Sequence, residues 1–211
     1  GPIYYYFMTP FLWFFNYDPV GPATMVALIG IATVWLVYKI GKEFFDPIVG
    51  LIAAGIYAVS PLVITYSRSS WNPNPMPFFS LLTLYTLYKA LIKNSVKLFL
   101  LCGFIFGITM QLHYLALFLG VVVFVYILLY HFTYSRKNLL KNSFNHYSLF
   151  FLGFLIGWFP FLVFEIRHGF QNITNIFNFL LNPTDVGGSV RFSEIIGNVF
   201  FRVFGRLVVN F

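Results

Sequence analysis

The sequence predicts an all-α protein, a polytopic bundle of transmembrane helices with about six spans and with interfacial or partial helices at both ends. Of its 211 residues, 59% are apolar and only 9% are charged, against roughly 25% charged in soluble domains, which excludes a soluble globule. Long uncharged stretches separate the charges, and the cations gather in alternate connections. The net charge of +7 therefore indicates membrane topology, with the lipid bilayer rather than nucleic acid as the partner.

Uncharged gaps between charged residues predict the spans, because a charge at the bilayer centre costs at least about 2.5 kcal/mol and one crossing needs about 20 residues. The gaps lie between Asp18 and Lys39, Asp46 and Arg68, Arg68 and Lys89, Lys97 and Arg136, and Lys141 and Glu165. Four of them fit one helix each. The remaining gap, the 38 residues between Lys97 and Arg136, fits two helices joined by a hairpin at Gln111, His113 and Tyr114.

The two ends are expected to differ from the core. Pro10 and the tyrosines beside it indicate a short or interfacial helix at the start. Arg202 and Arg206 lie on one helical face near the end, which fits an interfacial helix or the beginning of another span. The expected organisation is a single transmembrane domain with a short or interfacial helix over 1–17, a six-span core over 19–166, an outer loop over 167–193 and an amphipathic or partial helix over 194–211. With no initiator Met and no signal-peptide pattern, we expect an internal fragment of a larger protein.

The cations predict the orientation. Eight fall on one side of the predicted bundle: Lys39, Lys42, Lys89, Lys93, Lys97, Arg136, Lys137 and Lys141. Arg68, Arg167 and Arg191 fall on the other. The positive-inside rule places the larger group in the cytoplasm, as in a multi-pass protein of the plasma (inner) membrane. It places Arg68, His113, Glu165, Arg167 and His168 outside.

Arg68 lies in the polar stretch 66–75, where three prolines, at 73, 75 and 77, predict a stiff connection and a new helix near Met76 or Pro77. A guanidinium at the headgroup level can bind a phosphate through two hydrogen bonds. The alternative is that Arg68 and Trp71 are ordinary interfacial anchors.

Histidines divide into two groups. His113 lies within the long uncharged hairpin beside Tyr114, where a polar group needs a partner or a purpose. It either hydrogen-bonds a substrate or phosphate or is a turn residue that contacts water and headgroups. His131 and His146 neighbour basic connections, and solvated or lipid-facing roles are expected for them.

Glu165, Arg167 and His168 bring an acid, a base and an imidazole within four residues. Glu165 is the candidate catalytic carboxylate, either as a general base or as a partner of Arg68, but it can equally neutralise Arg167 at a helix end. Asn172 begins a glycosylation-acceptor pattern that is frequent by chance.

Other patterns point to packing rather than chemistry. Two small-xxx-small pairs, Gly103 with Gly107 and Gly153 with Gly157, predict close helix contacts. The single cysteine excludes a disulfide framework. No metal-ligand spacing or cofactor motif is present in the sequence, so no cofactor is identified, and the need for a divalent metal stays open.

An ordered series of segments resembles the polytopic GT-C glycosyltransferases, in the branch related to protein O-mannosyltransferases and lipid A aminoarabinose transferases (glycosyltransferase family 39 type). The segments are 1–6 (GPIYYY), 34–45 (VWLVYKIGKEFF), 50–54 (GLIAA), 60–61 (SP), 66–68 (YSR) and the Leu/Tyr-rich stretch 78–91. The resemblance implies transfer of a sugar from a polyisoprenyl-phosphate donor to a protein, lipid or glycan acceptor at the outer membrane face.

The resemblance also implies site residues. It makes Arg68 the candidate phosphate-binding arginine and the tyrosines 4–6 a lining near the acceptor loop, and it places the family's catalytic carboxylate upstream of Gly1, so that this fragment alone is expected to be inactive. The full candidate substrate-binding set is Arg68, His113, Tyr114, Arg167, Tyr4, Tyr5, Tyr66 and Asn72. The alternatives are a multipass transporter or lipid flippase, which usually places ionisable groups at the midplane, and a structural membrane subunit without chemistry.

Overall fold

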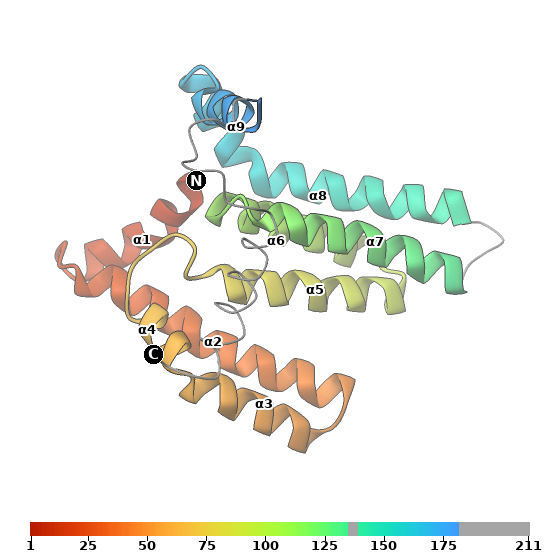
Figure 1. The fold of residues 1–211 in the computed structure, drawn as a ribbon, viewed down its shortest axis with the longest axis horizontal. Helices are drawn as coiled ribbons and strands as arrows, with labels where there is room; N and C mark the ends of the chain where they lie inside the picture. The colour runs from red at the N-terminus through yellow and green to blue at the C-terminus, as the bar shows by residue number, and fades with distance from the viewer. Residues whose placement is uncertain (135–138, 182–211) are drawn as a thin grey trace, which may run out of the picture.

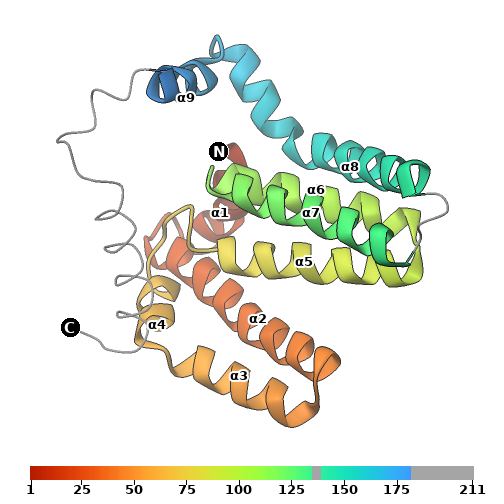
Figure 2. The ribbon, with the colours of Figure 1, turned by 45° about the vertical axis from the view of Figure 1, so that its right-hand side comes forward.

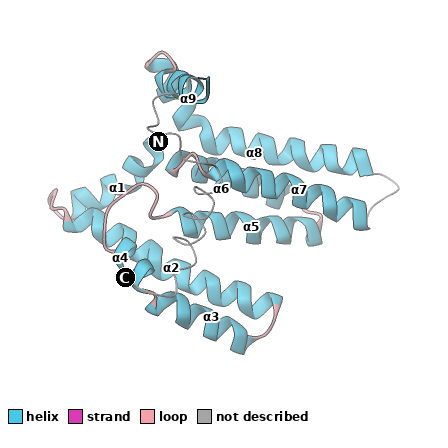
Figure 3. Ribbon diagram, viewed as in Figure 1, coloured by secondary structure: helices cyan, strands magenta, loops and turns pink. Residues whose placement is uncertain are grey.

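The computed structural model describes residues 1–134 and 139–181, and within them every regular element is an α-helix, which confirms the all-α prediction (Figure 3). The helices are α1 (Pro2–Phe14), α2 (Val20–Phe44), α3 (Pro47–Val59), α4 (Pro61–Ser67), α5 (Met76–Lys93), α6 (Val96–Leu112), α7 (Ala116–Tyr134), α8 (Leu139–Arg167) and α9 (Gln171–Leu181). The predicted partial helix over 194–211, and the part of the predicted outer loop after residue 181, lie outside the described residues. The described part of that loop contains α9.

The long helices run alongside one another, so that their connections gather at two ends (Figure 1). One end, here called the Arg68 end, holds the 68–75 connection, the 113–115 turn and the junction of α8 with α9. The other, here called the lysine end, holds the last turns of α2 and α5 and the first turn of α6. Lys39, Lys42, Lys89, Lys93 and Lys97 lie at the lysine end, so the cations that the sequence groups on one side are also grouped in space.

Prolines and an aspartate decide where α3 and α4 begin. The Asp46 carboxylate accepts hydrogen bonds from the backbone N–H groups of Ile48 (2.7 Å) and Val49 (2.9 Å), and thereby caps the start of α3. Pro61 has no N–H and forces Ser60 into an extended conformation (φ −61°, ψ 122°). The chain therefore bends by 64° between α3 and α4.

Glycines bring α6 and α8 into unusually close contact. A Cβ atom added to Gly103 would lie 1.9 Å from the Phe150 carbonyl oxygen, and one added to Gly157 would lie 2.2 Å from the Phe104 carbonyl oxygen. Only a residue without a side chain permits such backbone approach. The packing role that the sequence predicts for these glycines is confirmed.

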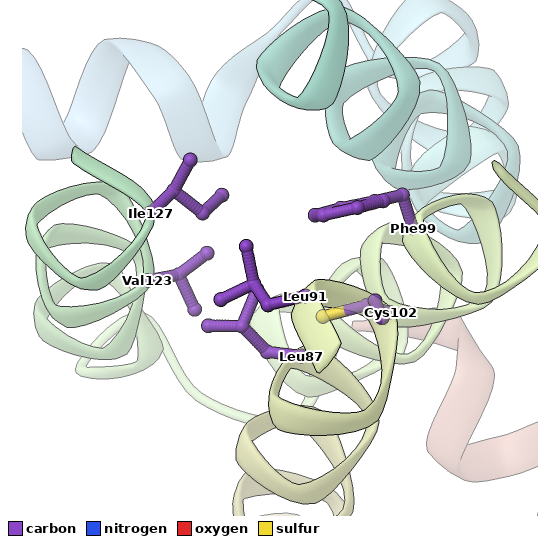
Figure 4. Close-up of a cluster of buried hydrophobic side chains, with 7 residues drawn as sticks. Leu87, Leu91, Phe99, Cys102, Val123 and Ile127 are labelled. Carbon is purple, nitrogen blue, oxygen red and sulfur yellow. The ribbon is translucent and has the colours of Figure 1, made fainter. Parts of the chain in front are cut away.

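A hydrophobic cluster fills the space between α5, α6 and α7 towards the lysine end. Figure 4 shows Leu87 and Leu91 of α5 beside Val123 and Ile127 of α7, with side chains of α6 completing the cluster. The full set is Leu87, Ala90, Leu91, Phe99, Cys102, Val123 and Ile127. A second cluster joins α1, α2 and α6 through Tyr4, Met25, Val26 and Leu112.

The described residues contain fewer candidate spans than the six predicted. Among the described residues, three helices are long and apolar enough to cross a membrane, α2, α7 and Ser143–Arg167 of α8, and the bent pair α3–α4 makes a fourth if it counts as one span. The helix α6 has only 17 residues, and α5 does not pass the same test. Both contain many buried residues, and a helix buried among other helices lacks charges just as a lipid-facing one does.

Large apolar side chains cover the outside of the candidate spans. On α7, Leu117, Phe118, Val121 and Phe124 are all more than half exposed. Contiguous apolar surface of this kind requires an apolar solvent. The protein is therefore an integral membrane protein.

Candidate functional site

The 68–75 connection at the Arg68 end is held in place by hydrogen bonds at both of its flanks. The Asn74 Nδ2 group donates to the carbonyl oxygens of Tyr66 (2.8 Å) and Ser69 (2.7 Å). The Tyr4 hydroxyl, on a side chain only 3% exposed, bonds the Ser70 hydroxyl at 2.7 Å. Burial raises the pKa of Tyr4, so its hydroxyl stays protonated and tethers the connection to α1.

Two cavities flank this connection, and Trp71 and Pro73 form part of the wall of both. The first has a volume of about 410 Å³ and is here called the polar cavity after the side chains of Asn72, Gln111, His113 and Asn172, which lie among apolar and aromatic residues in its wall. It is lined by Gly1, Trp71, Asn72, Pro73, Met110, Gln111, Leu112, His113, Tyr114, Trp158, Phe161, Asn172 and Ile173. The second, here called the apolar groove, has a volume of about 400 Å³ and lies between α2, the α3–α4 bend and the start of α5.

His113 and Tyr114, both predicted substrate-binding residues, lie in the wall of the polar cavity. Their rings stack with centroids 4.4 Å apart. The His113 Nδ1 atom accepts a hydrogen bond from the Leu115 backbone N–H at 3.2 Å, which leaves Nε2 to carry the proton in the neutral ring. Among the described residues Nε2 has no partner, so it is a donor available to a ligand.

Glu165 acts on the same cavity indirectly. Its side chain is fully buried (0% exposed), and its two oxygens accept from the Asn172 side-chain amide (2.5 Å) and the Ile173 backbone N–H (3.3 Å). Asn172 and Ile173 line the polar cavity, whereas Glu165 does not. The carboxylate thus fixes the first turn of α9 against the cavity.

A turn between α8 and α9 makes this contact possible. Gly169 has φ +66° and Phe170 has φ +58°, the left-handed conformation that glycine adopts without strain. The Phe170 backbone N–H returns to the Glu165 carbonyl oxygen at 2.9 Å. The chain turns there, and α9 leaves at an angle to α8 (Figure 2).

The remaining predicted site residues lie on different surfaces. Asn72 lines the polar cavity and Tyr66 the apolar groove. Arg68, Arg167 and Tyr5 are exposed at the Arg68 end and line neither cavity. No ion pair joins either arginine to Glu165 or to any other carboxylate in the described part of the chain, so the predicted Glu165–Arg68 and Glu165–Arg167 pairings are absent there.

The expectation for His131 and His146 is wrong. Both are buried rather than solvated (3% and 9% exposed). His131 Nε2 lies 2.8 Å from His146 Nδ1, and His146 Nε2 lies 3.0 Å from the Asn94 side-chain oxygen. The His146 ring also stacks on Phe99, with centroids 3.9 Å apart. These hydrogen bonds connect α7, α8 and the turn after α5. The three segments are distant in sequence, so the sequence alone does not show that they meet.

Sequence reasoning placed Gln111 at the hairpin but did not identify it as a site residue. It lines the polar cavity and is only 2% exposed. Its side-chain amide donates to the Gly157 carbonyl oxygen at 2.7 Å. The only sequence signal was a polar residue in an uncharged stretch, which Gln111 shares with His113.

Metal ligation finds no support in the described ranges. Within residues 1–134 and 139–181, no three His, Cys, Asp or Glu side chains come together in a way that can hold a metal ion. What the Arg68 end offers instead is hydrogen-bond donors and aromatic faces around a polar cavity, beside an apolar groove.

One comparison with known proteins identifies a family. A family model described as dolichyl-phosphate-mannose-protein mannosyltransferase matches residues 1–164, a range that includes Trp71 and Pro73 but not Asn172 and Ile173. Searches of curated proteins and of solved structures returned no match. The matched segment covers well over half of the 211 residues. The chain therefore belongs to the dolichyl-phosphate-mannose-protein mannosyltransferase family and is a membrane glycosyltransferase.

Proposed function

We propose that the protein transfers a sugar from a polyisoprenyl-phosphate donor to a protein, lipid or glycan acceptor at the outer face of the plasma membrane, and that the Arg68 end is its donor site. The family description names a dolichyl-phosphate-mannose donor and a protein acceptor. The proposal extends the lipid-phosphate donor class to this chain and leaves the identity of the sugar to experiment.

One observation carries the proposal: the polar cavity and the apolar groove share Trp71 and Pro73. A lipid-phosphate sugar has an apolar tail and a polar head joined by a phosphate. An apolar groove next to a polar cavity matches that division, with the tail in the groove and the sugar in the cavity.

Cationic and neutral donors are available for the phosphate between them. Arg68 lies three residues before Trp71, which lines both cavities. Its guanidinium has no ion-pair partner among the described residues. A guanidinium binds phosphate oxygens through two parallel hydrogen bonds. The His113 Nε2 group supplies a second donor from the polar cavity. Both donors stabilise the charge that develops on a phosphate leaving group.

Glu165 is a positioning residue in this proposal, because both of its oxygens are engaged and it does not line the cavity. The catalytic carboxylate is then proposed to lie upstream of Gly1. Gly1 itself lines the polar cavity.

Orientation follows from the same proposal. The lysine end faces the cytoplasm by the positive-inside rule, and the Arg68 end faces outward. A cysteine introduced at Ser69, which is exposed, should then react with a membrane-impermeant thiol reagent added to the outside of intact cells.

The test is sugar transfer by the complete gene product, reconstituted in proteoliposomes with a labelled polyprenyl-phosphate mannose. Arg68→Ala should lower kcat/KM by about 10- to 100-fold, since a hydrogen bond to a charged group contributes about 1.5–3 kcal/mol. The matched control is Lys97→Ala, which removes an exposed cation at the lysine end and should leave transfer unchanged. Wild-type transfer by Arg68→Ala, or consumption of nucleotide sugars in place of lipid-phosphate sugars, would contradict the proposal.

A further inference from the structure

We propose that the side-chain oxygen of Gln111 accepts a hydrogen bond from a hydroxyl group of the donor sugar. The inference rests on the proposed function and names the residue that distinguishes a glycosylated lipid phosphate from the bare lipid phosphate. Its ligand class is a polyhydroxylated ring, because such a ring supplies the hydrogen-bond donor that Gln111 lacks.

The orientation of the Gln111 amide follows from its one hydrogen bond. The Gly157 carbonyl oxygen, 2.7 Å away, can only accept, so the amide nitrogen must face it and the oxygen must face the other way. That oxygen, Oε1, is buried and has no hydrogen-bond partner among the described residues. Buried carbonyl oxygens are nearly always paired. Because Gln111 lines the polar cavity, we assign the missing partner of this oxygen to a ligand in that cavity.

The backbone of α6 next to Gln111 is held close to α8. Gln111 follows Gly107 on α6 by four residues, and a Cβ added to Gly107 would lie 2.6 Å from the Phe154 carbonyl oxygen and 2.8 Å from the Gly157 carbonyl carbon. The backbones of α6 and α8 are therefore in direct contact one turn away. A hydrogen bond made by Gln111 needs little ordering of the side chain, which favours recognition.

The neighbours of Gln111 also suit a sugar. Trp158 and Phe161 line the same cavity, and their rings stack with centroids 5.1 Å apart. Aromatic faces pack against the apolar C–H face of a sugar ring, while its hydroxyl groups need acceptors at the edge. Gln111 provides such an acceptor on the side of the cavity formed by α6.

The experiment compares two probes, polyprenyl phosphate and its mannosyl derivative, binding to the complete gene product in nanodiscs. Gln111→Leu should weaken binding of the mannosyl lipid by about two- to tenfold, the range for one neutral hydrogen bond, and leave binding of the bare lipid phosphate unchanged. The control is Thr109→Val, on the same helix. Thr109 is buried, bonds only its own helix at the Ile105 carbonyl oxygen and lines no described cavity, so neither affinity should change.

A second measurement does not depend on how well Gln111→Leu folds. Mannosyl lipids that lack one hydroxyl group each are tested on the wild-type protein. One of them should bind more weakly by the same factor, and Gln111→Asn, whose shorter side chain withdraws the oxygen, should bind that analogue and the normal donor equally.

The outcomes separate the two proposals. If neither lipid binds the wild-type protein, the proposed function fails. If both bind but Gln111→Leu weakens them equally, or weakens neither, the lipid-phosphate site stands and the sugar contact is refuted. Full retention of binding by every deoxy analogue leads to the same refutation.

Discussion

Replacing Gly153 with alanine should force α8 away from α6 and lower the stability of the bundle. A Cβ atom at Gly153 would lie 2.1 Å from the Leu100 carbonyl oxygen and 3.0 Å from the Phe104 backbone nitrogen. Both are backbone atoms, so no side-chain rotation relieves the overlap. Since real Cβ contacts stay above 3.0 Å, the two helices must separate by about 1 Å, and every contact along their seam is stretched.

The expected magnitude combines two opposing effects. Overpacking a close contact costs about 1–3 kcal/mol, and the rigidity of the backbone places this change at the upper end. Alanine also favours a helix over glycine by about 1 kcal/mol. The net loss of unfolding free energy should therefore be about 2 kcal/mol.

Gly55→Ala is the matched control. Gly55 lies in α3, and a Cβ added there meets nothing within 4 Å. Alanine at this position has the same helix preference over glycine but overlaps no other atom. The free energy of unfolding should therefore stay equal or rise by up to about 1 kcal/mol.

The assay is unfolding of wild type and both variants in one detergent, by denaturant titration followed through tryptophan fluorescence. Gly153→Ala should unfold at lower denaturant than wild type, and Gly55→Ala should not. Equal stability of the two variants would refute the close approach of α6 and α8 on which the placement of Gln111 also depends.

Three further substitutions test other contacts. Asp46→Ala removes the cap of α3 and should cost about 1 kcal/mol of unfolding free energy in the same titration, while an unchanged midpoint would mean that the cap contributes nothing. Glu165→Gln weakens the hold on Asn172 and should speed amide hydrogen exchange at the start of α9 without lowering global stability, whereas unchanged exchange would count against its positioning role. His146→Leu leaves a buried nitrogen of His131 unpaired and should cost about 1–3 kcal/mol, and wild-type stability would show that the chain of hydrogen bonds is not formed.

Much of the helical framework was readable from the order of residues along the chain. The uncharged gaps contain most of the length of helices α2 to α8, whereas α1 and α9 lie outside them. Pro73, Pro75 and Pro77 predict a helix beginning near Met76, and α5 begins at Met76. The spacing of Gly153 and Gly157 predicted close packing, because a small residue on every fourth position lies on one face of a helix.

Predictions made from the positions of charged residues were less accurate where a segment buried by protein and a segment facing lipid have the same sequence pattern. The segments that form α5 and α6 carry no midspan charges, yet α6 is short and both are packed among other helices. His131 and His146 lie near basic connections in sequence but bond each other inside the bundle. A linear count of charges does not distinguish these environments.

The candidate site required the tertiary structure for a related reason. The candidate residues Asn72, His113 and Tyr114 were visible in the sequence, but that they share a cavity with Gln111 was not. Nor was it visible that Glu165 bonds Asn172 instead of an arginine.

Length, charge spacing and glycine spacing are properties of single segments in a bilayer, so the sequence by itself determined the helical class, the membrane environment and the grouping of the cations. Which polar groups meet depends on the rotation of each helix and on distances of an ångström between helices. Those quantities arise only when all the segments pack together, and so only the tertiary structure decided the cavities, the partner of Glu165 and the unpaired oxygen of Gln111.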